Sequence, residues 1–206
     1  MSIFDREYKR YDSWYERNKF AYLSELNLLR ELIPKKKKGL EVGVGTARFA
    51  EELKTDFGID PSFNMIKIAK ERGIKCTVAS GENLPFRNNS FDYLTMIITI
   101  CFIDNPAKAL WEAKRVLRKK GKIIIGFIDK MSFLGKFYQK KQSPFYKQAK
   151  FFSIDSISKL LTSQAFQDLS YFQTLFDFPN SLNQPDKPKT GYGKGSFVVV
   201  KASKGD

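Results

Sequence analysis

Short apolar segments alternate with helix-forming segments along most of this chain of 206 residues. No other feature restricts the possible folds as strongly, because strands that alternate with helices pair into a parallel sheet with helices on its faces. Strands are predicted at residues 39–45, 56–60, 74–79, 91–103 and 119–129. The run at 91–103 is continuously apolar, as expected for a strand that is buried on both faces. The pattern therefore predicts an α/β protein.

The last third of the chain follows the same pattern less regularly. Two more strands are predicted at residues 169–176 and 196–202, and a loop containing Pro, Gly and Asn connects them without a helix. Because a connection without a helix favours antiparallel neighbours, the final pair of strands is expected to be antiparallel. The predicted fold is a Rossmann-like, doubly wound sheet of seven strands, mostly parallel with an antiparallel last strand.

The length fits one domain of ordinary size, and residues 1–206 are predicted to form a single domain. Residues 130–152 are rich in aromatic residues and lysine without a clean period, and we interpret them as an inserted cap segment. Residues 1–33 are predicted to be helical, with aromatic residues at spacings of three or four. That stripe is typical of core packing, and a lid over a ligand is the alternative. Its members are Tyr8, Tyr11, Trp14 and Tyr15.

The turn after the first strand carries the most informative residues. Glycines at such a turn, here Gly43 and Gly45, let the backbone approach a ligand closely, and the following helix offers free N–H groups. Glu41 lies inside the strand, where a dinucleotide-binding fingerprint has an apolar residue, and Arg48 stands at the position of its third glycine. A buried carboxylate needs a cationic or N–H partner. Glu41 therefore suits an ammonium group and would repel a pyrophosphate.

A second acid, Asp60, ends the next predicted strand. A carboxylate at that place can accept hydrogen bonds from both hydroxyls of a ribose. An adenine ring is expected between Pro61 and Leu84. The chain has no Gly-Lys-Ser/Thr sequence, which excludes a P-loop. A ligand with a ribose, an adenine-like ring and a positive amino-acid-like end fits S-adenosylmethionine.

With these motifs the chain resembles the class I S-adenosylmethionine-dependent methyltransferases, in particular the small-molecule group with ubiquinone/menaquinone-type motifs. The resemblance is most specific over residues 39–126, at 39–46, 58–65, 79–86 and 90–93. It implies a methyltransferase enzyme whose cofactor is S-adenosylmethionine and whose product is S-adenosylhomocysteine. It places the methionine part at Glu41, Gly43 and Gly45, and the ribose at Asp60. The full set of expected cofactor-binding residues is Glu41, Gly43, Gly45, Asp60, Pro61, Ser80, Gly81, Glu82 and Leu84.

Two positions depart from the pattern of this family. Ser80 stands where the usual Asp accepts a hydrogen bond from the adenine amino group, so part of the adenine recognition is expected to move to the backbone of Gly81 and Glu82. Ala47 stands where many members have a third glycine. Alanine is expected to be tolerated there if its φ is negative.

The methyl acceptor is expected to be a small molecule. Its pocket is predicted to form between the N-terminal helices, the cap and the loop before the last strand. Aromatic walls suit an aromatic acceptor, and the interleaved lysines suit an anionic one. The expected substrate-binding residues are Tyr11, Trp14, Tyr15, Tyr146 and Tyr192.

The chain contains no histidine and two cysteines, which excludes a histidine base and the common zinc sites, so no metal is expected. No catalytic residue is assigned, because a methyl donor that is already activated needs positioning above all.

The formal net charge of +14 leaves an RNA methyltransferase of the same fold as an alternative. An RNA-binding face would require clustered basic residues, whereas the lysines are spread along the chain, so nucleic acid is disfavoured as the partner. A cofactor-binding protein without catalysis is the other alternative. The N-terminus lacks the apolar core of a signal peptide, and no apolar run is long enough to cross a bilayer. We therefore expect a cytoplasmic protein without a membrane span.

Overall fold

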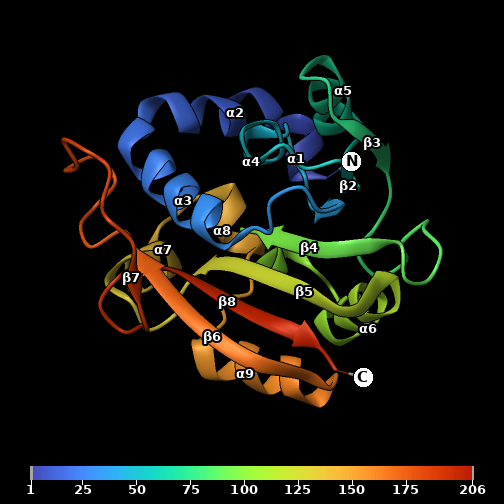
Figure 1. The fold of residues 1–206 in the computed structure, drawn as a ribbon. Helices are drawn as coiled ribbons and strands as arrows, with labels where there is room; N and C mark the ends of the chain where they lie inside the picture. Colours follow the sequence, from blue (N-terminus) through green and yellow to red (C-terminus); the bar gives the residue numbers. More distant parts are fainter. Residues whose placement is uncertain (1, 206) are drawn as a thin grey trace.

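The chain folds around one sheet of eight strands, shown in Figure 1. The computed structural model describes residues 2–205. The strands lie in the order β3-β2-β1-β4-β5-β8-β6-β7 across the sheet. Their bounds are β1 Gly39–Val42, β2 Phe57–Asp60, β3 Lys75–Val78, β4 Phe91–Ile97, β5 Leu117–Ile128, β6 Phe166–Thr174, β7 Lys189–Thr190 and β8 Phe197–Lys204. The predicted α/β fold with a Rossmann-like sheet is confirmed.

The five strands β1 to β5 pair in parallel, and β8 is antiparallel to both β5 and β6. The predicted antiparallel last strand is therefore confirmed, although it lies inside the sheet and not at its edge. The strand beyond the predicted seven is β7, which pairs Lys189 and Thr190 with the end of β6. Two residues are too few to produce a recognisable period, so the sequence did not predict this edge strand.

Helices cover both faces of the sheet, as Figure 1 shows, with α3, α4 and α5 on one face and α6 and α9 on the other. The helix bounds are α1 Ile3–Arg6, α2 Tyr8–Arg17, α3 Lys19–Leu32, α4 Arg48–Leu53, α5 Phe63–Glu71, α6 Pro106–Val116, α7 Phe133–Lys140, α8 Pro144–Gln148 and α9 Ile154–Ser163. Within residues 2–205, none of the helices combines the length and the apolar character that a bilayer crossing requires.

The central strand β4 explains why its sequence is continuously apolar. Successive side chains of a strand point to opposite faces. Leu94 and Met96 pack with the residues under α6 and α9, whereas Tyr93 and Ile97 pack with those under α3 and α4. All four are buried. Because both faces are covered by helices, neither set can be polar.

The structure corrects the predicted end of this strand, because β4 stops at Ile97 and the prediction extended it over 91–103. Ile98 adopts a left-handed backbone conformation with a φ of +52°, and a short 3₁₀ helix follows at Ile100–Phe102. The residues beyond the strand stay apolar because Ile100 and Ile103 remain in the core. Hydropathy reports this burial and cannot show where the strand pairing ends.

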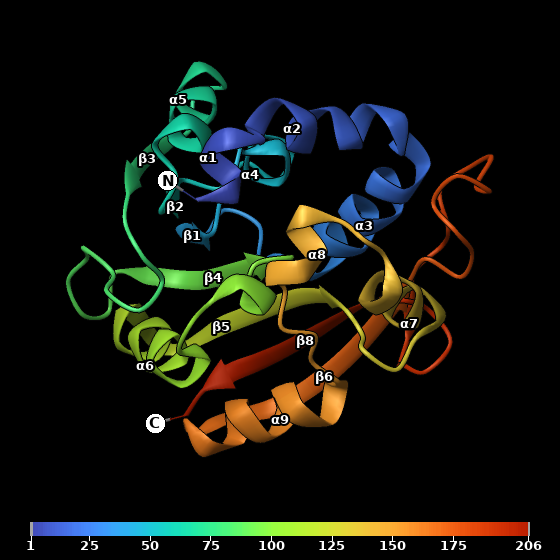
Figure 2. The same cartoon turned by 180° about the vertical axis from the view of Figure 1, so that it is seen from behind.

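Two groups of helices lie at the edge where the parallel strands end. The first is the N-terminal group α1, α2 and α3, and the second is α7 and α8 from the predicted cap segment 130–152. Figure 2 shows α8 beside the N-terminal helices. Ligands of doubly wound sheets bind at this edge. Both groups therefore lie where they can enclose a ligand.

Candidate active site

The turn after β1 brings the backbone close to β4. Gly43 and Gly45 adopt positive φ values of +72° and +54°, a conformation that side chains disfavour. A Cβ atom added to Gly43 would lie 2.3 Å from the side chain of Thr99, which follows β4. The amide groups of Gly43 and Val44 both donate to the carbonyl oxygen of Ile59 at 2.8 Å. This turn is therefore compact, and it lies between the ends of β2 and β4.

The side chain of Glu41 is 2% exposed, and its Oε2 has no hydrogen-bond partner among residues 2–205. Burial, and to a smaller extent the charge of Asp60, raises the pKa of Glu41 to about 8. An unpartnered carboxylate oxygen in the interior is costly unless a cation or a donor reaches it. The ammonium group of the methionine part of S-adenosylmethionine is such a partner, so this position fits the expected cofactor.

The side chain of Asp60 accepts hydrogen bonds from the amides of Gly45 at 3.0 Å and Ser62 at 2.8 Å. Burial raises the pKa of Asp60 to about 6, against the lowering effect of these two hydrogen bonds. Each bond uses one oxygen, and a carboxylate has about four lone-pair positions. Asp60 therefore retains acceptor capacity for ribose hydroxyls.

The segment expected to meet the adenine ring is held to the loop after β4. Glu82 accepts a hydrogen bond from the hydroxyl of Ser80, and its other oxygen accepts from the amides of Asp104 and Asn105 at 3.1 Å. Between them, Gly81 is buried against the side chain of Val42. The serine that replaces the family's usual Asp is thus paired to a neighbouring acid.

The two residues expected to flank adenine differ in accessibility. Pro61 is exposed. Leu84 packs in the core, and its amide donates to Glu112 at 2.7 Å. An adenine ring could therefore contact Pro61 from solvent, whereas the side chain of Leu84 lies in the interior.

The N-terminal helices contact this region directly. A Cβ atom at Gly45 would lie 3.6 Å from the ring of Tyr11 in α2. Asp5 of α1 accepts a hydrogen bond from the hydroxyl of Ser62 at 2.6 Å, and its carbonyl oxygen accepts from the side chain of Asn64 at 2.9 Å. The start of the chain therefore lies against the turns that follow β1 and β2.

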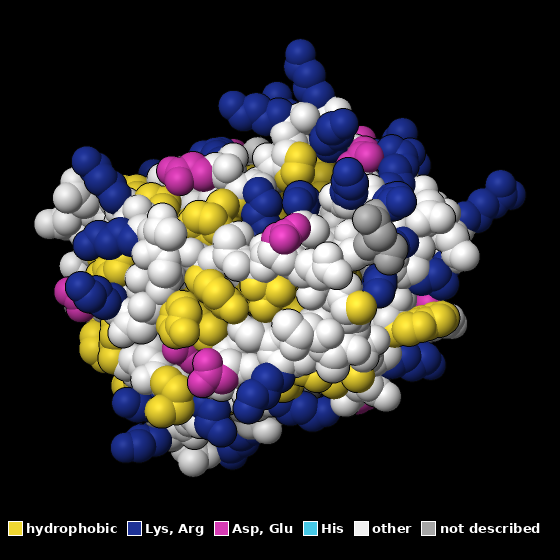
Figure 3. All heavy atoms as spheres, turned by 60° about the horizontal axis from the view of Figure 1, so that its bottom comes forward, with side chains coloured by type: hydrophobic (Ala, Val, Ile, Leu, Met, Phe, Trp, Pro, Cys, Tyr) yellow, Lys and Arg dark blue, Asp and Glu magenta, His cyan; other side chains and the backbone are white. Residues whose placement is uncertain are grey.

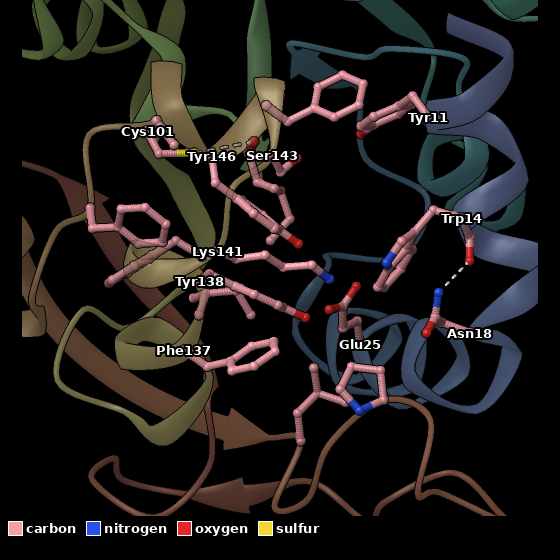
Figure 4. Close-up of a pocket in the computed structure, with 18 of the residues that line it drawn as sticks. Tyr11, Trp14, Asn18, Glu25, Cys101, Phe137, Tyr138, Lys141, Ser143 and Tyr146 are labelled. Carbon is pink, nitrogen blue, oxygen red and sulfur yellow. Dashed lines mark hydrogen bonds between the residues drawn. The ribbon is translucent and has the colours of Figure 1, made fainter. Parts of the chain in front are cut away.

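A cavity of about 780 Å³ opens between the N-terminal helices, the segment after β4 and the cap. Figure 4 shows its walls. Four of the five expected substrate-binding residues line it, namely Tyr11, Trp14, Tyr15 and Tyr146. The fifth, Tyr192, is half exposed, packs its ring against Tyr171 and is not among the lining residues. Aromatic rings dominate the walls: Phe4, Phe102, Phe127, Phe137, Tyr138, Phe145, Phe151, Phe152 and Phe178 also line the cavity.

Sequence reasoning missed Glu25, which lines the same cavity from α3 and is 3% exposed. A signal was present, because Glu25 lies four residues after Ala21 and four before Leu29, both fully buried on the same helix. An acid on the apolar stripe of a helix is either paired or functional.

The fold and the acids together define a class of protein. A glycine turn with buried acids at the ends of two adjacent parallel strands fits a nucleoside cofactor that carries a positive charge. Residues 2–205 contain no cluster of three or more acidic or thiol side chains that could hold a metal ion.

Comparisons with known proteins agree with this class. A family model described as a methyltransferase domain matches residues 40–125. A structure from Thermotoga maritima, described as an S-adenosylmethionine-dependent methyltransferase and possible histamine N-methyltransferase, has 44% identity, covers 98% of each chain and has a TM-score of 0.96. An uncharacterized protein of Methanocaldococcus jannaschii is 44% identical over 99% of this chain and 100% of its own length.

More distant proteins extend the comparison. The ubiquinone/menaquinone biosynthesis C-methyltransferase of Rickettsia bellii is 37% identical over 50% of this chain and 42% of its own length. Phosphoethanolamine N-methyltransferase 2 of Haemonchus contortus, solved with S-adenosylmethionine, shares the fold at 19% identity with a TM-score of 0.64, over 90% of this chain and 53% of its own. The chain belongs to the class I S-adenosylmethionine-dependent methyltransferases, and S-adenosylmethionine is its cofactor.

Proposed function

We propose that this methyltransferase acts on a small molecule, which it binds in the aromatic cavity beside the cofactor site. The observation that carries this proposal is the cavity itself. Its volume of about 780 Å³ lies in the range of small-molecule sites. Tyr11 connects the two sites, because it lines the cavity and also lies against Gly45.

The chain's own residues contribute mainly position. When bound, the cofactor supplies a methyl group activated by a positively charged sulfur. Glu41 binds its ammonium group and Asp60 its ribose, with Gly43, Gly45, Pro61 and the segment Ser80 to Glu82 around them. The aromatic walls hold the acceptor and exclude water. Orienting two reactants in this way can contribute roughly 7–11 kcal/mol to lowering the barrier.

We further propose that residues 1–33 act as the lid and that 130–152 act as the cap of this site. The support is that α2 and α3 line one side of the cavity, and α7 and α8 line the other. A site enclosed by two segments favours a small acceptor, which the segments can surround, and disfavours a polymer.

The charges on the face drawn in Figure 3 favour the same choice. Figure 3 shows one face of the molecule, on which Lys and Arg side chains are scattered between acidic and hydrophobic ones and form no continuous stripe. A nucleic-acid-binding channel would concentrate basic side chains along the path of the phosphate backbone. This face has no such row of basic side chains.

The location of the acceptor is tested by filling the cavity. Ala149 lines it from the end of α8 and is half buried. We expect Ala149→Trp to reduce the transfer of labelled methyl groups into the low-mass fraction of a cell extract by at least about tenfold, because the ring occupies acceptor space. Ala149→Ser should retain activity, and both variants should bind S-adenosylhomocysteine like the wild type. Label in the RNA fraction that is insensitive to Ala149→Trp would contradict a small-molecule acceptor.

The cofactor site is tested by calorimetry with S-adenosylhomocysteine. Asp60→Asn should weaken binding by roughly 10- to 100-fold, because a hydrogen bond to a charged acceptor contributes about 1.5–3 kcal/mol. Glu71→Gln, an exposed acid at the end of α5, is the matched control and should bind like the wild type. Equal affinities for the two variants would show that Asp60 does not contact the ligand.

A further inference from the structure

Glu25 lies in an unusual place for an acid. It is on the side of α3 that faces the core, and its helix neighbours Ala21, Leu28 and Leu29 are fully buried. Its carboxylate points into the aromatic cavity, as Figure 4 shows. Buried acids of proteins are normally paired with a base or bound by several donors.

The carboxylate of Glu25 has neither kind of partner. It makes no hydrogen bond or ion pair with any residue of 2–205. Burial alone raises the pKa of Glu25 to about 8. The titratable groups that its charge influences are the hydroxyls of Tyr11, Tyr15, Tyr138 and Tyr146. A conformation that places an unsatisfied acid in a cavity suggests that the missing partner arrives with the ligand.

The rings beside Glu25 are suited to the same kind of partner. Trp14 and Tyr138 flank its carboxylate in Figure 4, and Phe137 lies next to Tyr138. The rings of Tyr138 and Tyr146 stack at a centroid distance of 4.4 Å with planes 14° apart. A cation over the face of an aromatic ring, within about 6 Å of its centre, is attracted by the ring's quadrupole. Aromatic rings that lie beside one carboxylate suit an organic ammonium group.

We propose that Glu25 recognises the ammonium group of the methyl acceptor, which is therefore a small organic amine. This inference rests on the proposed function, since it identifies the acceptor class of the same cavity. The ammonium group binds between Glu25, Trp14 and Tyr138. The remainder of the acceptor extends along the aromatic walls toward Tyr11, which faces the cofactor site.

An anionic acceptor held by basic residues is the competing assignment. Arg10, Arg17 and Lys141 also line the cavity, and in Figure 4 the amine of Lys141 points toward Glu25 from the opposite wall. All three basic residues are exposed, and Lys141 also lies 5.6 Å from the ring centre of Phe137. Water can solvate these three basic groups in the free protein. Glu25 is only 3% exposed, so water cannot solvate its carboxylate in the same way. An anion in the cavity would disfavour the ionised form of Glu25, whereas an ammonium group pairs with that form and stabilises it, so the cation is favoured.

The test uses three probes of similar shape and different charge. They are phenethylamine, neutral 2-phenylethanol and anionic 3-phenylpropionate, each titrated by calorimetry into the full chain saturated with S-adenosylhomocysteine. We expect phenethylamine to bind at least about tenfold more tightly than 2-phenylethanol, since a charge-assisted hydrogen bond is about twice as strong as a neutral one. Equal binding of the amine and the alcohol, or tightest binding of 3-phenylpropionate, would overturn the proposal.

Matched variants assign the effect to one residue. Glu25→Gln keeps the size of the side chain and should weaken phenethylamine binding at least about tenfold while leaving 2-phenylethanol within about twofold. Lys141→Gln should not weaken the amine. A loss of phenethylamine binding in Lys141→Gln but not in Glu25→Gln would contradict the assignment. Unchanged affinity for S-adenosylhomocysteine verifies that each variant is folded.

The two proposals fail in different ways. If labelled methyl groups enter the RNA fraction and Ala149→Trp does not reduce that label, the proposed small-molecule function fails. If Ala149→Trp abolishes transfer to the low-mass fraction and phenethylamine binds no more tightly than 2-phenylethanol, only the assignment of Glu25 fails.

Discussion

At the scale of single residues, Ala47 adopts a conformation that alanine rarely takes. Its φ is +65°, in the left-handed region, where the sequence expectation required a negative value for alanine to be tolerated. The condition stated for alanine is therefore not met, and the buried methyl group explains how alanine is accommodated. Ala47 is fully buried in a cluster with Val44, Ala50 and Ile66. The packing of its Cβ offsets the strain of the turn.

This balance predicts a nearly neutral outcome for Ala47→Gly. Glycine relieves a left-handed strain of about 1–2 kcal/mol. It loses roughly 0.8 kcal/mol of methyl burial and about 0.5–1 kcal/mol of chain entropy. We expect the free energy of unfolding to change by less than about 1 kcal/mol in urea denaturation.

The control for this variant is Ala113→Gly, which removes an equally buried methyl group from the interior of α6, where the backbone is helical. Nothing offsets the loss there, so a destabilisation of about 1.3–1.8 kcal/mol is expected. Equal effects of the two substitutions would contradict the strain assigned to Ala47.

At the scale of elements, one acid connects α2 to the turn after β1. Asp12 accepts hydrogen bonds from Thr46 at 2.6 Å, from Arg48 at 2.7 and 2.9 Å, and from Arg72 at 3.1 Å. Burial raises the pKa of Asp12, but the hydrogen bonds lower it by more and hold it well below its usual range. The side chain of Asp12 is only 20% exposed. Such a network differs from a surface ion pair, which contributes little.

Removing this acid should loosen the N-terminal helices. We expect Asp12→Ala to lower the free energy of unfolding by about 2 kcal/mol, because two guanidinium groups lose charge-assisted bonds. Amide hydrogen exchange, measured by mass spectrometry, should accelerate within α1 and α2 more than in β4.

The control for Asp12 is an exposed ion pair between Arg30 and Glu52. Glu52→Ala should cost no more than about 1 kcal/mol and leave exchange in α2 unchanged. Uniform acceleration over the whole chain in Asp12→Ala would indicate general destabilisation and would contradict a local anchor.

At the scale of the whole molecule, buried acids dominate the dependence of stability on pH near neutrality. The chain has no histidine, so the group that usually titrates between pH 5 and 8 is absent. Burial raises the pKa of Glu25 and Glu41 to about 8 and that of Asp60 to about 6. In this range the folded state therefore retains protons that the unfolded state has released.

The sign of the resulting effect is set by linkage. Stabilisation from these raised pKa values is complete below the ordinary carboxyl range and is lost as the pH rises through about 6 for Asp60 and about 8 for the two glutamates. We expect the melting temperature of the ligand-free protein to fall between about pH 5.5 and 8.5, by roughly 4–8 °C for each fully buried glutamate if each contributes about 2 kcal/mol.

The assignment is checked with the double variant Glu25→Gln/Glu41→Gln, in which calorimetric melting should be nearly independent of pH above the range in which Asp60, with its pKa of about 6, still titrates. Glu31→Gln on the exposed side of α3 should follow the wild-type curve. A wild-type melting temperature that rises with pH would contradict the unpaired state of these acids.

The parts predictable from sequence are those that local patterns encode. The glycine turn and its acids were recognised because a strand, a turn and a helix start lie within a few consecutive residues around Glu41 and Gly45. The end of β4 and the edge strand β7 were not recognised. The apolar run continues past the end of β4 because the following residues are also buried, so the sequence does not show where the strand ends. Strand β7 has only two residues, too few for a recognisable pattern.

The sequence by itself determined which acids lie at the proposed cofactor site, and the tertiary structure decided the cavity proposed for the acceptor. Parallel strands bring their carboxyl ends to one edge, so Glu41 and Asp60 become neighbours as soon as β1 and β2 pair. The cavity instead depends on how α2 and α3 meet α7 and α8, more than 100 residues later in the chain. Such long-range packing placed Glu25 among the rings and left Tyr192 outside, because side-chain direction across distant elements has no local code.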